Sequence, residues 1–235
     1  MILKEGLDKL NIKYDDEIID KFKIYKDLLI EWNEKINLTT ITEENEVYIK
    51  HFLDSISCLL SDKIEENAKV IDVGTGAGFP GLPIKMIRKD IKLTLLDSLN
   101  KRINFLKEVC DNIGIDDVEF IHSRAEDGGK NPEYRQQFDV VVSRAVANLT
   151  VLLEYTTPFL KVGGYMVCLK GPSLDEELKD AKKALEVLNM EFVEDKEFQI
   201  PFDDRTKRLL ILKKIGDTPK KYPRKAGKPT KQPLK

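Results

Sequence analysis

A short apolar strand that runs directly into a glycine-rich loop constrains the fold of this chain most. Residues 69–73 read Lys-Val-Ile-Asp-Val, and Gly74-Thr-Gly-Ala-Gly-Phe-Pro-Gly81 follows at once. A buried strand, a glycine turn and a helix (82–88) form the first unit of a doubly wound α/β sheet. Because glycine has no Cβ, the backbone of such a loop can approach a ligand closely. The feature therefore predicts an α/β fold with a ligand site after its first strand.

The chain after residue 67 alternates between short apolar segments and helical patterns. This alternation predicts a doubly wound, mainly parallel sheet. We expect strands at 69–73, 93–97, 118–122, 138–143, 165–170, 192–200 and 208–214. We expect helices at 82–88, 98–110, 149–160 and 174–188, with a Gly163-Gly164 turn before the fifth strand. The last two strands are expected to form a terminal antiparallel pair.

The first sixty residues carry apolar side chains at helical spacing, which predicts helices that pack by one face. The two stripes are Phe22, Tyr25, Leu29, Trp32 and Ile36, then Tyr48, Phe52, Ile56 and Leu59. We therefore expect an N-terminal helical extension (1–66) packed on a ligand-binding core (67–215). A basic, proline-containing tail (216–235) is expected to follow.

Composition excludes several classes of protein. Three cysteines and two histidines are too few for a disulfide scaffold or a histidine-rich metal centre, so no metal is expected. No apolar run approaches the roughly 20 residues that cross a bilayer. The first residues mix acids and bases without the apolar region of a secretion signal. A soluble, cytoplasmic monomer without membrane contact is the expectation.

The net charge of −2 is unevenly distributed. Residues 213–235 hold nine Lys or Arg and one acid, whereas the remaining chain carries a net charge of −10. Four prolines predict that this tail is extended rather than helical. Composition alone leaves two interpretations open, a solubilising end and a surface that binds nucleic acid.

The candidate site residues follow the strands, at the sheet edge where ligands bind in such folds. They are Gly74, Gly76, Gly78, Asp97, Ala125, Glu126, Arg144 and Lys170. Asp97 ends the second strand, where a carboxylate can accept both hydroxyls of a ribose. Glu126 follows the third strand and could face an adenine. Together they predict a nucleoside-containing cofactor.

Two cofactors fit the glycine loop. Gly76, Gly78 and Gly81 can be aligned to G-x-G-x-x-G, which would suit NAD(P). However, Gly74-x-Gly76-x-Gly78 after Val70-Ile-Asp72 resembles motif I of class I S-adenosylmethionine (SAM, AdoMet)-dependent methyltransferases. In that family a carboxylate at the position of Asp72 contacts the methionine end directly or through water. S-adenosylmethionine is therefore the expected cofactor.

A closer resemblance covers nearly the whole chain. The blocks that carry it are Asn37-Leu-Thr39, His51-Phe-Leu-Asp-Ser55, Asp72-Val-Gly-Thr-Gly-Ala-Gly-Phe-Pro-Gly-Leu-Pro83, Ser143-Arg-Ala-Val-Ala147, Lys170-Gly171 and Tyr222-Pro-Arg-Lys-Ala-Gly227. They resemble the bacterial 16S ribosomal RNA small-subunit methyltransferase G family, also called glucose-inhibited division protein B. The resemblance implies methylation of guanine N7 in the 530 loop of 16S rRNA, at standard position 527. It also implies cofactor contacts at Gly74, Phe79, Ala125, Glu126 and Arg144, with Asp97 at the ribose.

The chemistry of the chain is consistent with this reaction. No Asn/Asp-Pro-Pro-Tyr follows the fourth strand, as amino-directed adenine methyltransferases have, and no cysteine ends a strand for attack on a pyrimidine. Guanine N7 carries a free lone pair, so no general base is required. We hypothesise that Arg144 and Lys170 hold phosphate or the cofactor carboxylate. The resemblance also favours RNA contact by the tail, at Lys220, Lys221, Arg224, Lys225 and Lys228.

Three other interpretations remain open at this point. A dehydrogenase would need a hydride-accepting site and a proton donor. A ribosome-assembly or RNA-binding protein could retain the cofactor fold without turnover. A methyltransferase of small molecules would share the glycine loop but would have no use for a basic tail. The partner expected here is 16S rRNA or the small ribosomal subunit.

Overall fold

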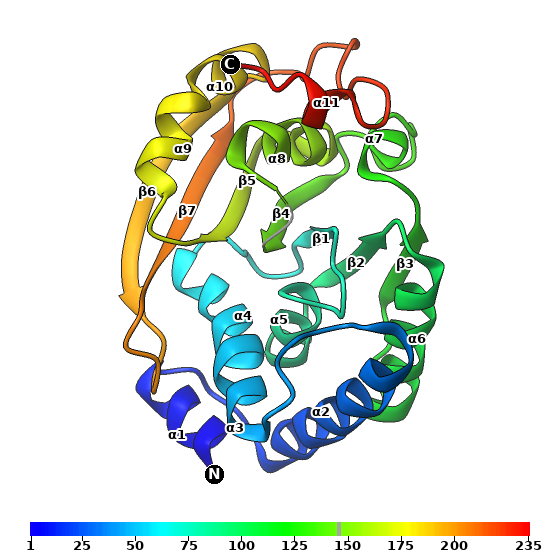
Figure 1. Ribbon diagram of the computed structural model, residues 1–235, viewed down its shortest axis with the longest axis vertical. Helices are drawn as coiled ribbons and strands as arrows, with labels where there is room; N and C mark the ends of the chain where they lie inside the picture. The colour runs from blue at the N-terminus through cyan, green and yellow to red at the C-terminus, as the bar shows by residue number, and fades with distance from the viewer. Residues whose placement is uncertain (145–146) are drawn as a thin grey trace.

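The computed structural model describes residues 1–144 and 147–235 and shows one seven-stranded sheet, in the order β3-β2-β1-β4-β5-β7-β6 (Figure 1). The strands are β1 (Lys69–Val73), β2 (Lys92–Asp97), β3 (Val118–His122), β4 (Phe138–Arg144), β5 (Leu160–Lys170), β6 (Met190–Gln199) and β7 (Thr206–Lys214). The first five strands pair in parallel, and β7 is antiparallel to both β5 and β6. The predicted doubly wound, mainly parallel sheet with a terminal antiparallel pair is confirmed.

Helical segments cover both faces of this sheet. Before β1 they are α1 (Ile2–Lys9), α2 (Asp16–Ile36), α3 (Glu44–Val47), the π-helix η1 (Tyr48–Leu53), α4 (Asp54–Ile56) and the 3₁₀ helix η2 (Ser57–Ser61). After β1 they are α5 (Gly81–Ile87), α6 (Asn100–Ile113), α7 (Ala125–Gly128), α8 (Leu149–Thr156), η3 (Thr157–Phe159), α9 (Leu174–Asp180), α10 (Lys182–Val187) and α11 (Lys228–Lys231). None of the helices formed by the described residues is both long and apolar enough to span a bilayer.

Side chains that alternate along the strands separate two apolar cores. On one face Val70, Val140 and Val142 pack with the N-terminal helices, α5 and α6. On the other face Ile71 and Val141 pack with α8, α9, α10 and Tyr222 of the C-terminal segment. Strand β4 is therefore buried on both faces, as its continuous apolar run predicts.

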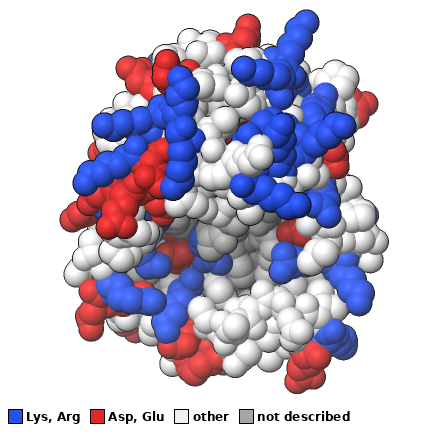
Figure 2. Space-filling view, turned by 45° about the horizontal axis from the view of Figure 1, so that its top comes forward, with Lys and Arg blue, Asp and Glu red and all other residues white. Residues whose placement is uncertain are grey.

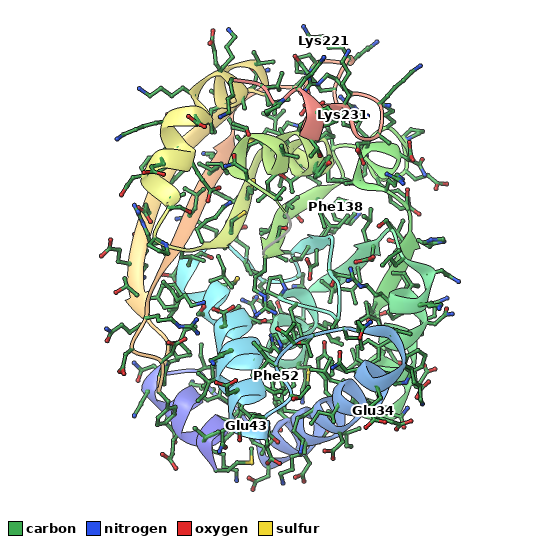
Figure 3. All side chains as sticks on the ribbon, viewed as in Figure 1. Glu34, Glu43, Phe52, Phe138, Lys221 and Lys231 are labelled. Atoms are coloured by element: carbon green, nitrogen blue, oxygen red, sulfur yellow. The ribbon has the colours of Figure 1, made fainter. Side chains whose placement is uncertain are left out.

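The N-terminal helices form where the apolar stripes predict them. Asp15 caps α2 by accepting a hydrogen bond from the backbone of Ile18, and Asn37 ends the helix in the left-handed conformation. Phe22 and Tyr25 are fully buried, and their helix packs on α6. Phe52, labelled in Figure 3, belongs to η1, and its ring contacts those of Phe22 and Tyr25. The second stripe is also helical, but its central turn is a π-helix.

Two predicted elements differ in the structure. Gly163 and Gly164 do not form a turn, because β5 already begins at Leu160 and contains them. A Cβ on Gly164 would lie 2.7 Å from the Asp139 carbonyl oxygen, so glycine permits the irregular pairing of β4 with β5. The helix expected at 174–188 is divided at Ala181, whose ψ of −2° ends α9.

Candidate active site

A cavity of about 570 Å³ opens at the carboxyl ends of β1 to β4, beside the point where the strand order reverses. The strand-following residues that line it are Gly74, Thr75, Gly76, Ala77, Phe79, Asp97, Ser98, Ser123, Arg124, Ala125, Glu126 and Arg144. More distant segments close it with Leu38, His51, Tyr155, Gly227 and Thr230. The sheet thus brings together most of the predicted cofactor residues.

Hydrogen bonds to the second strand, β2, fix the backbone of the glycine loop. The backbone N–H groups of Gly74 and Thr75 donate to the Leu96 carbonyl at 2.9 and 3.0 Å, and that of Gly76 donates to Asp97 Oδ2 at 2.9 Å. Gly76 has a φ of +61°, and a Cβ placed on it would meet no atom within 4 Å. That open space is the cavity itself, so the glycine leaves room for a ligand along the loop.

Asp72 lies beneath this loop rather than in the cavity. Its Oδ2 accepts hydrogen bonds from Thr75 Oγ1 and the Gly81 backbone N–H, both at 2.8 Å. Burial raises the pKa of Asp72 to about 7 despite these two donors. In the structure Asp72 supports the loop through Oδ2, and its contact with the methionine end, directly or through water, stays a prediction. Gly78 is also outside the cavity wall, because its missing Cβ faces Tyr25 and Leu106.

Asp97 and Glu126 both line the cavity and are almost fully buried. Asp97 accepts from the backbones of Gly76 and Leu99, each at 2.9 Å, which fixes the orientation of its carboxylate. Glu126 Oε1 accepts from the Gly227 backbone N–H at 3.0 Å. Two oriented carboxylates after neighbouring strands can accept hydrogen bonds from ribose hydroxyls and an exocyclic amine.

Arg144 ends β4 and binds His51 and Asp54 at the edge of the cavity. We call these three side chains the partition. Its guanidinium lies 4.8 Å from the centre of the Phe79 ring, on which His51 stacks at 4.6 Å. Nη1 donates to Asp54 Oδ2 at 2.8 Å and to the Lys50 carbonyl at 3.0 Å. Phe79 also contacts Tyr25, so it serves the core and the cavity wall together.

The hydrogen bonds of this partition define the tautomer of His51. Arg144 Nη2 lies 3.0 Å from Nδ1, and since a guanidinium only donates, Nδ1 is the acceptor. Nε2 then carries the proton and donates to Thr39 Oγ1 at 2.7 Å. Burial and the nearby Arg144 charge lower the pKa of His51 to about 3, so the ring is neutral at pH 7.

A second cavity of about 770 Å³ lies on the other side of the partition. It shares His51 and Arg144 with the first and is also lined by Asp54, Lys170, Glu177 and Lys207. Lys170 belongs to this second cavity alone and donates to Glu177 Oε2 at 2.7 Å. Lys170 therefore shares the second cavity with Arg144 and lies outside the cavity lined by Gly74, Asp97 and Glu126.

The C-terminal segment (216–235) packs on the body instead of extending from it. Arg224 donates to both carboxylate oxygens of the fully buried Glu154, at 2.6 to 3.0 Å. Arg135 donates to the carbonyls of Thr218 and Tyr222 at 2.8 and 2.9 Å. The segment also contains the helical turn α11, so the prediction of an entirely non-helical tail was wrong. Arg224 is engaged in this contact and is not a free basic group for RNA.

Two groups of site residues were missed by sequence reasoning. Tyr155, Gly227 and Thr230 line the first cavity, with Tyr155 Oη 3.1 Å from Thr230 Oγ1. His51 and Asp54 form the partition together with Arg144. His51, Asp54 and Gly227 all belong to the sequence blocks quoted above, which was the available signal. Of the Ser143-Arg-Ala-Val-Ala147 block, residues 145 and 146 lie outside the described residues.

Comparison with known proteins identifies the family. Residues 18–206 match the family model described as "GidB: rRNA small subunit methyltransferase G". The chain belongs to this family. The expected family resemblance is thus confirmed, and the activity that its members are named for is methylation of small-subunit rRNA.

Among the groups of His, Cys, Asp and Glu in the described ranges, none has the arrangement of a metal site.

Individual relatives agree along their whole length. The ribosomal RNA small subunit methyltransferase G of Alkaliphilus oremlandii is 56% identical, and the match covers 100% of this chain and 98% of that protein. The protein of the same name from Alkaliphilus metalliredigens is 54% identical, again over 100% of this chain and 98% of the relative. The chain therefore matches these two relatives over nearly their whole length.

Solved structures agree at the level of the fold. A SAM dependent methyltransferase from Aquifex aeolicus superimposes with a TM-score of 0.53 at 18% identity, covering 75% of this chain and 96% of that one. M. jannaschii TYW2 in complex with AdoMet gives a TM-score of 0.53 at 16% identity, over 69% of this chain and 77% of that one. The chain has the same Rossmann-like architecture.

Proposed function

We propose that this chain transfers a methyl group from S-adenosylmethionine to N7 of a guanosine in the 530 loop of 16S rRNA, standard position 527. The observation that carries the proposal is the glycine-loop cavity of a chain in an rRNA methyltransferase family. Two buried carboxylates, Asp97 and Glu126, face this cavity after successive strands. Such a pair suits a nucleoside with a ribose and an exocyclic amine.

The residues present fit that cofactor. The backbone at Gly74 and Gly76 lets the ligand lie against the loop, and Phe79 covers one side. Asp97 is positioned for the ribose hydroxyls, and Ala125 and Glu126 for the adenine. When bound, S-adenosylmethionine supplies an electrophilic methyl group on a positively charged sulfur. The chain must therefore place a nucleophile in line with that methyl and exclude water.

Guanine N7 suits a site that offers placement rather than proton transfer. Its lone pair is free and no proton leaves it, so the chain needs no general base. Burial and Arg144 lower the pKa of His51 to about 3, so this ring is too weak a base to take a proton from the substrate. Positioning of two reactants can by itself lower a barrier by roughly 7–11 kcal/mol. Arg144 contributes by holding His51 and Asp54 in the partition. Lys170 is paired with Glu177 in the wall of the second cavity, where its ammonium group can also contact a phosphate.

Lysines of the C-terminal segment form the proposed contact with rRNA phosphates. Lys220, Lys221, Lys225 and Lys228 are exposed, unlike Arg224. Lys221 lies at the outer edge of the molecule, and Lys231 nearby on the same segment (Figure 3). Figure 2 shows Lys and Arg gathered above a hollow on this face. Replacing the four exposed lysines by glutamine should lower the salt slope of RNA binding by up to about 3, since each phosphate contact contributes about 0.7–0.9.

The decisive experiment supplies methyl-labelled S-adenosylmethionine to small subunits whose rRNA has never been methylated. The rRNA is then cleaved chemically at 7-methylguanosine. We expect label at one guanosine of the 530 loop. An Asp97→Ala variant should lose both S-adenosylhomocysteine binding and labelling. Label at another position, or none despite S-adenosylhomocysteine binding by the unaltered protein, would refute the proposed target.

A further inference from the structure

We infer that the second cavity holds the target guanine and that Asp54 accepts hydrogen bonds from its Watson–Crick edge, an inference that rests on the function proposed above. The cavity volume of about 770 Å³ lies within the roughly 300–1,000 Å³ typical of small-molecule sites. Its wall contains His51 and Arg144, which also line the cofactor cavity. A base in the second cavity therefore meets the cofactor site at the partition.

Asp54 differs from the other carboxylate in this cavity. Its side chain is buried, and Oδ2 accepts from Arg144. Lys207 Nζ lies 3.1 Å from Oδ1, but no described residue donates a hydrogen bond to that oxygen. Both oxygens of Glu177 are already acceptors, from Ser173 Oγ, Lys170 Nζ and the Leu149 backbone. Among the described residues, Asp54 Oδ1 is therefore the acceptor of the cavity wall that receives no hydrogen bond; it is buried beside Lys207, whose ammonium must move aside for a base to reach it.

The Arg144–Asp54 pair matches the order of polar groups on guanine. Arg144 uses three of its five N–H groups, toward Lys50, Asp54 and His51, and has two more to donate. Both hydrogens of Nη1, the nitrogen beside Asp54, are used, so the free donors of Arg144 are Nε–H and the second N–H of Nη2, on the guanidinium that adjoins the acceptor Asp54. Guanine presents the acceptor O6 next to the donors N1–H and the 2-amino group. Adenine presents a donor and then an acceptor at these two positions, so its polar groups would be left unpaired.

Charge supports the same assignment. Methylation at N7 places positive charge on the guanine ring, and a carboxylate beside the ring stabilises that charge. A lone guanidinium would oppose it, but Asp54 balances the charge of Arg144 at 2.8 Å. Lys50, Lys207 and Arg205 also line the cavity and can contact the phosphates of the same nucleotide. Figure 2 shows Lys and Arg beside the hollow of this face.

Binding of GMP, IMP and AMP to the protein saturated with S-adenosylhomocysteine tests the inference without catalysis. IMP lacks only the 2-amino group, so we expect GMP to bind about 10- to 100-fold more tightly than IMP, as for loss of a hydrogen bond to a charged group. AMP should bind more weakly than GMP. In Asp54→Asn the preference for GMP over IMP should fall to within about twofold, with S-adenosylhomocysteine affinity retained.

Lys207→Gln is the matched control, because it removes a cation next to Asp54 and keeps the acceptor. This variant should weaken the binding of GMP, IMP and AMP by a similar factor and preserve the order of their affinities. Equal binding of GMP and IMP by the unaltered protein would overturn the inference even if Asp54→Asn failed to fold. So would an Asp54→Asn protein that kept the original preference. Selective GMP binding without label in the rRNA would instead retain this base site and refute the proposed reaction.

Discussion

Replacing Arg224 by alanine leaves the carboxylate of Glu154 buried without its cation. Glu154 is fully buried, and Arg224 supplies it with hydrogen bonds from Nε, Nη2 and the backbone N–H. Breaking one side of a buried ion pair costs about 3–5 kcal/mol. The Arg224 side chain keeps 17% of its surface exposed, so we expect the lower end, about 3 kcal/mol. For a chain of this length, that corresponds to a fall in Tm of about 6–12 °C.

Urea unfolding measures this effect, with Lys225→Ala as the matched control on the exposed side of the same segment. We expect Lys225→Ala to change the free energy of unfolding by less than about 0.5 kcal/mol. Arg224→Ala should also weaken S-adenosylhomocysteine binding, since Gly227 of the same segment donates to Glu126 in the cavity wall. If both variants unfolded at the same urea concentration and Arg224→Ala weakened only RNA binding, Arg224 would be a surface contact and the reasoning would be refuted.

Three further predictions concern the loop and the partition. The pKa of Asp72, raised to about 7 in the folded chain, means that the folded state binds more protons than the unfolded state between about pH 4 and pH 7. The free energy of unfolding should therefore fall as pH rises through this window, and Asp72→Asn should flatten that part of the profile. Gly76→Ala and Gly114→Ala both impose a side chain at a φ near +60°, costing about 1–2 kcal/mol, but only Gly76→Ala should weaken S-adenosylhomocysteine binding in calorimetry. Arg144→Ala should reduce cofactor or RNA affinity at least tenfold, because Asp54 and His51 lose their shared donor; unchanged affinity for both would exclude a site role.

The strands and the glycine loop were predictable because local patterns determine them. A run such as Phe138-Asp-Val-Val-Val is typical of a strand that is buried on both faces of a parallel sheet. The position of Asp97 and Glu126 follows from the same rule, since the ends of parallel strands meet at one edge. The structure places both in the cavity, as the order of strands implies.

Pairs between distant segments were not predictable from local patterns. Arg144 ends a strand beside the cavity, yet its guanidinium is held by Asp54, 90 residues earlier in the chain. Composition indicates that Arg224 is one base in a basic tail, whereas the fold brings it to Glu154, 70 residues away.

By itself, the sequence determined the family, the sheet and the edge at which the cofactor site lies. The resemblance of whole sequence blocks carries the family, whereas hydrophobic period and glycine spacing encode the sheet and its site edge over a few residues. The tertiary structure alone decided which polar groups are free to act. Burial makes an unpaired charge costly, so long-range partners such as Asp54 for Arg144 and Glu154 for Arg224 determine which side chains remain for a ligand.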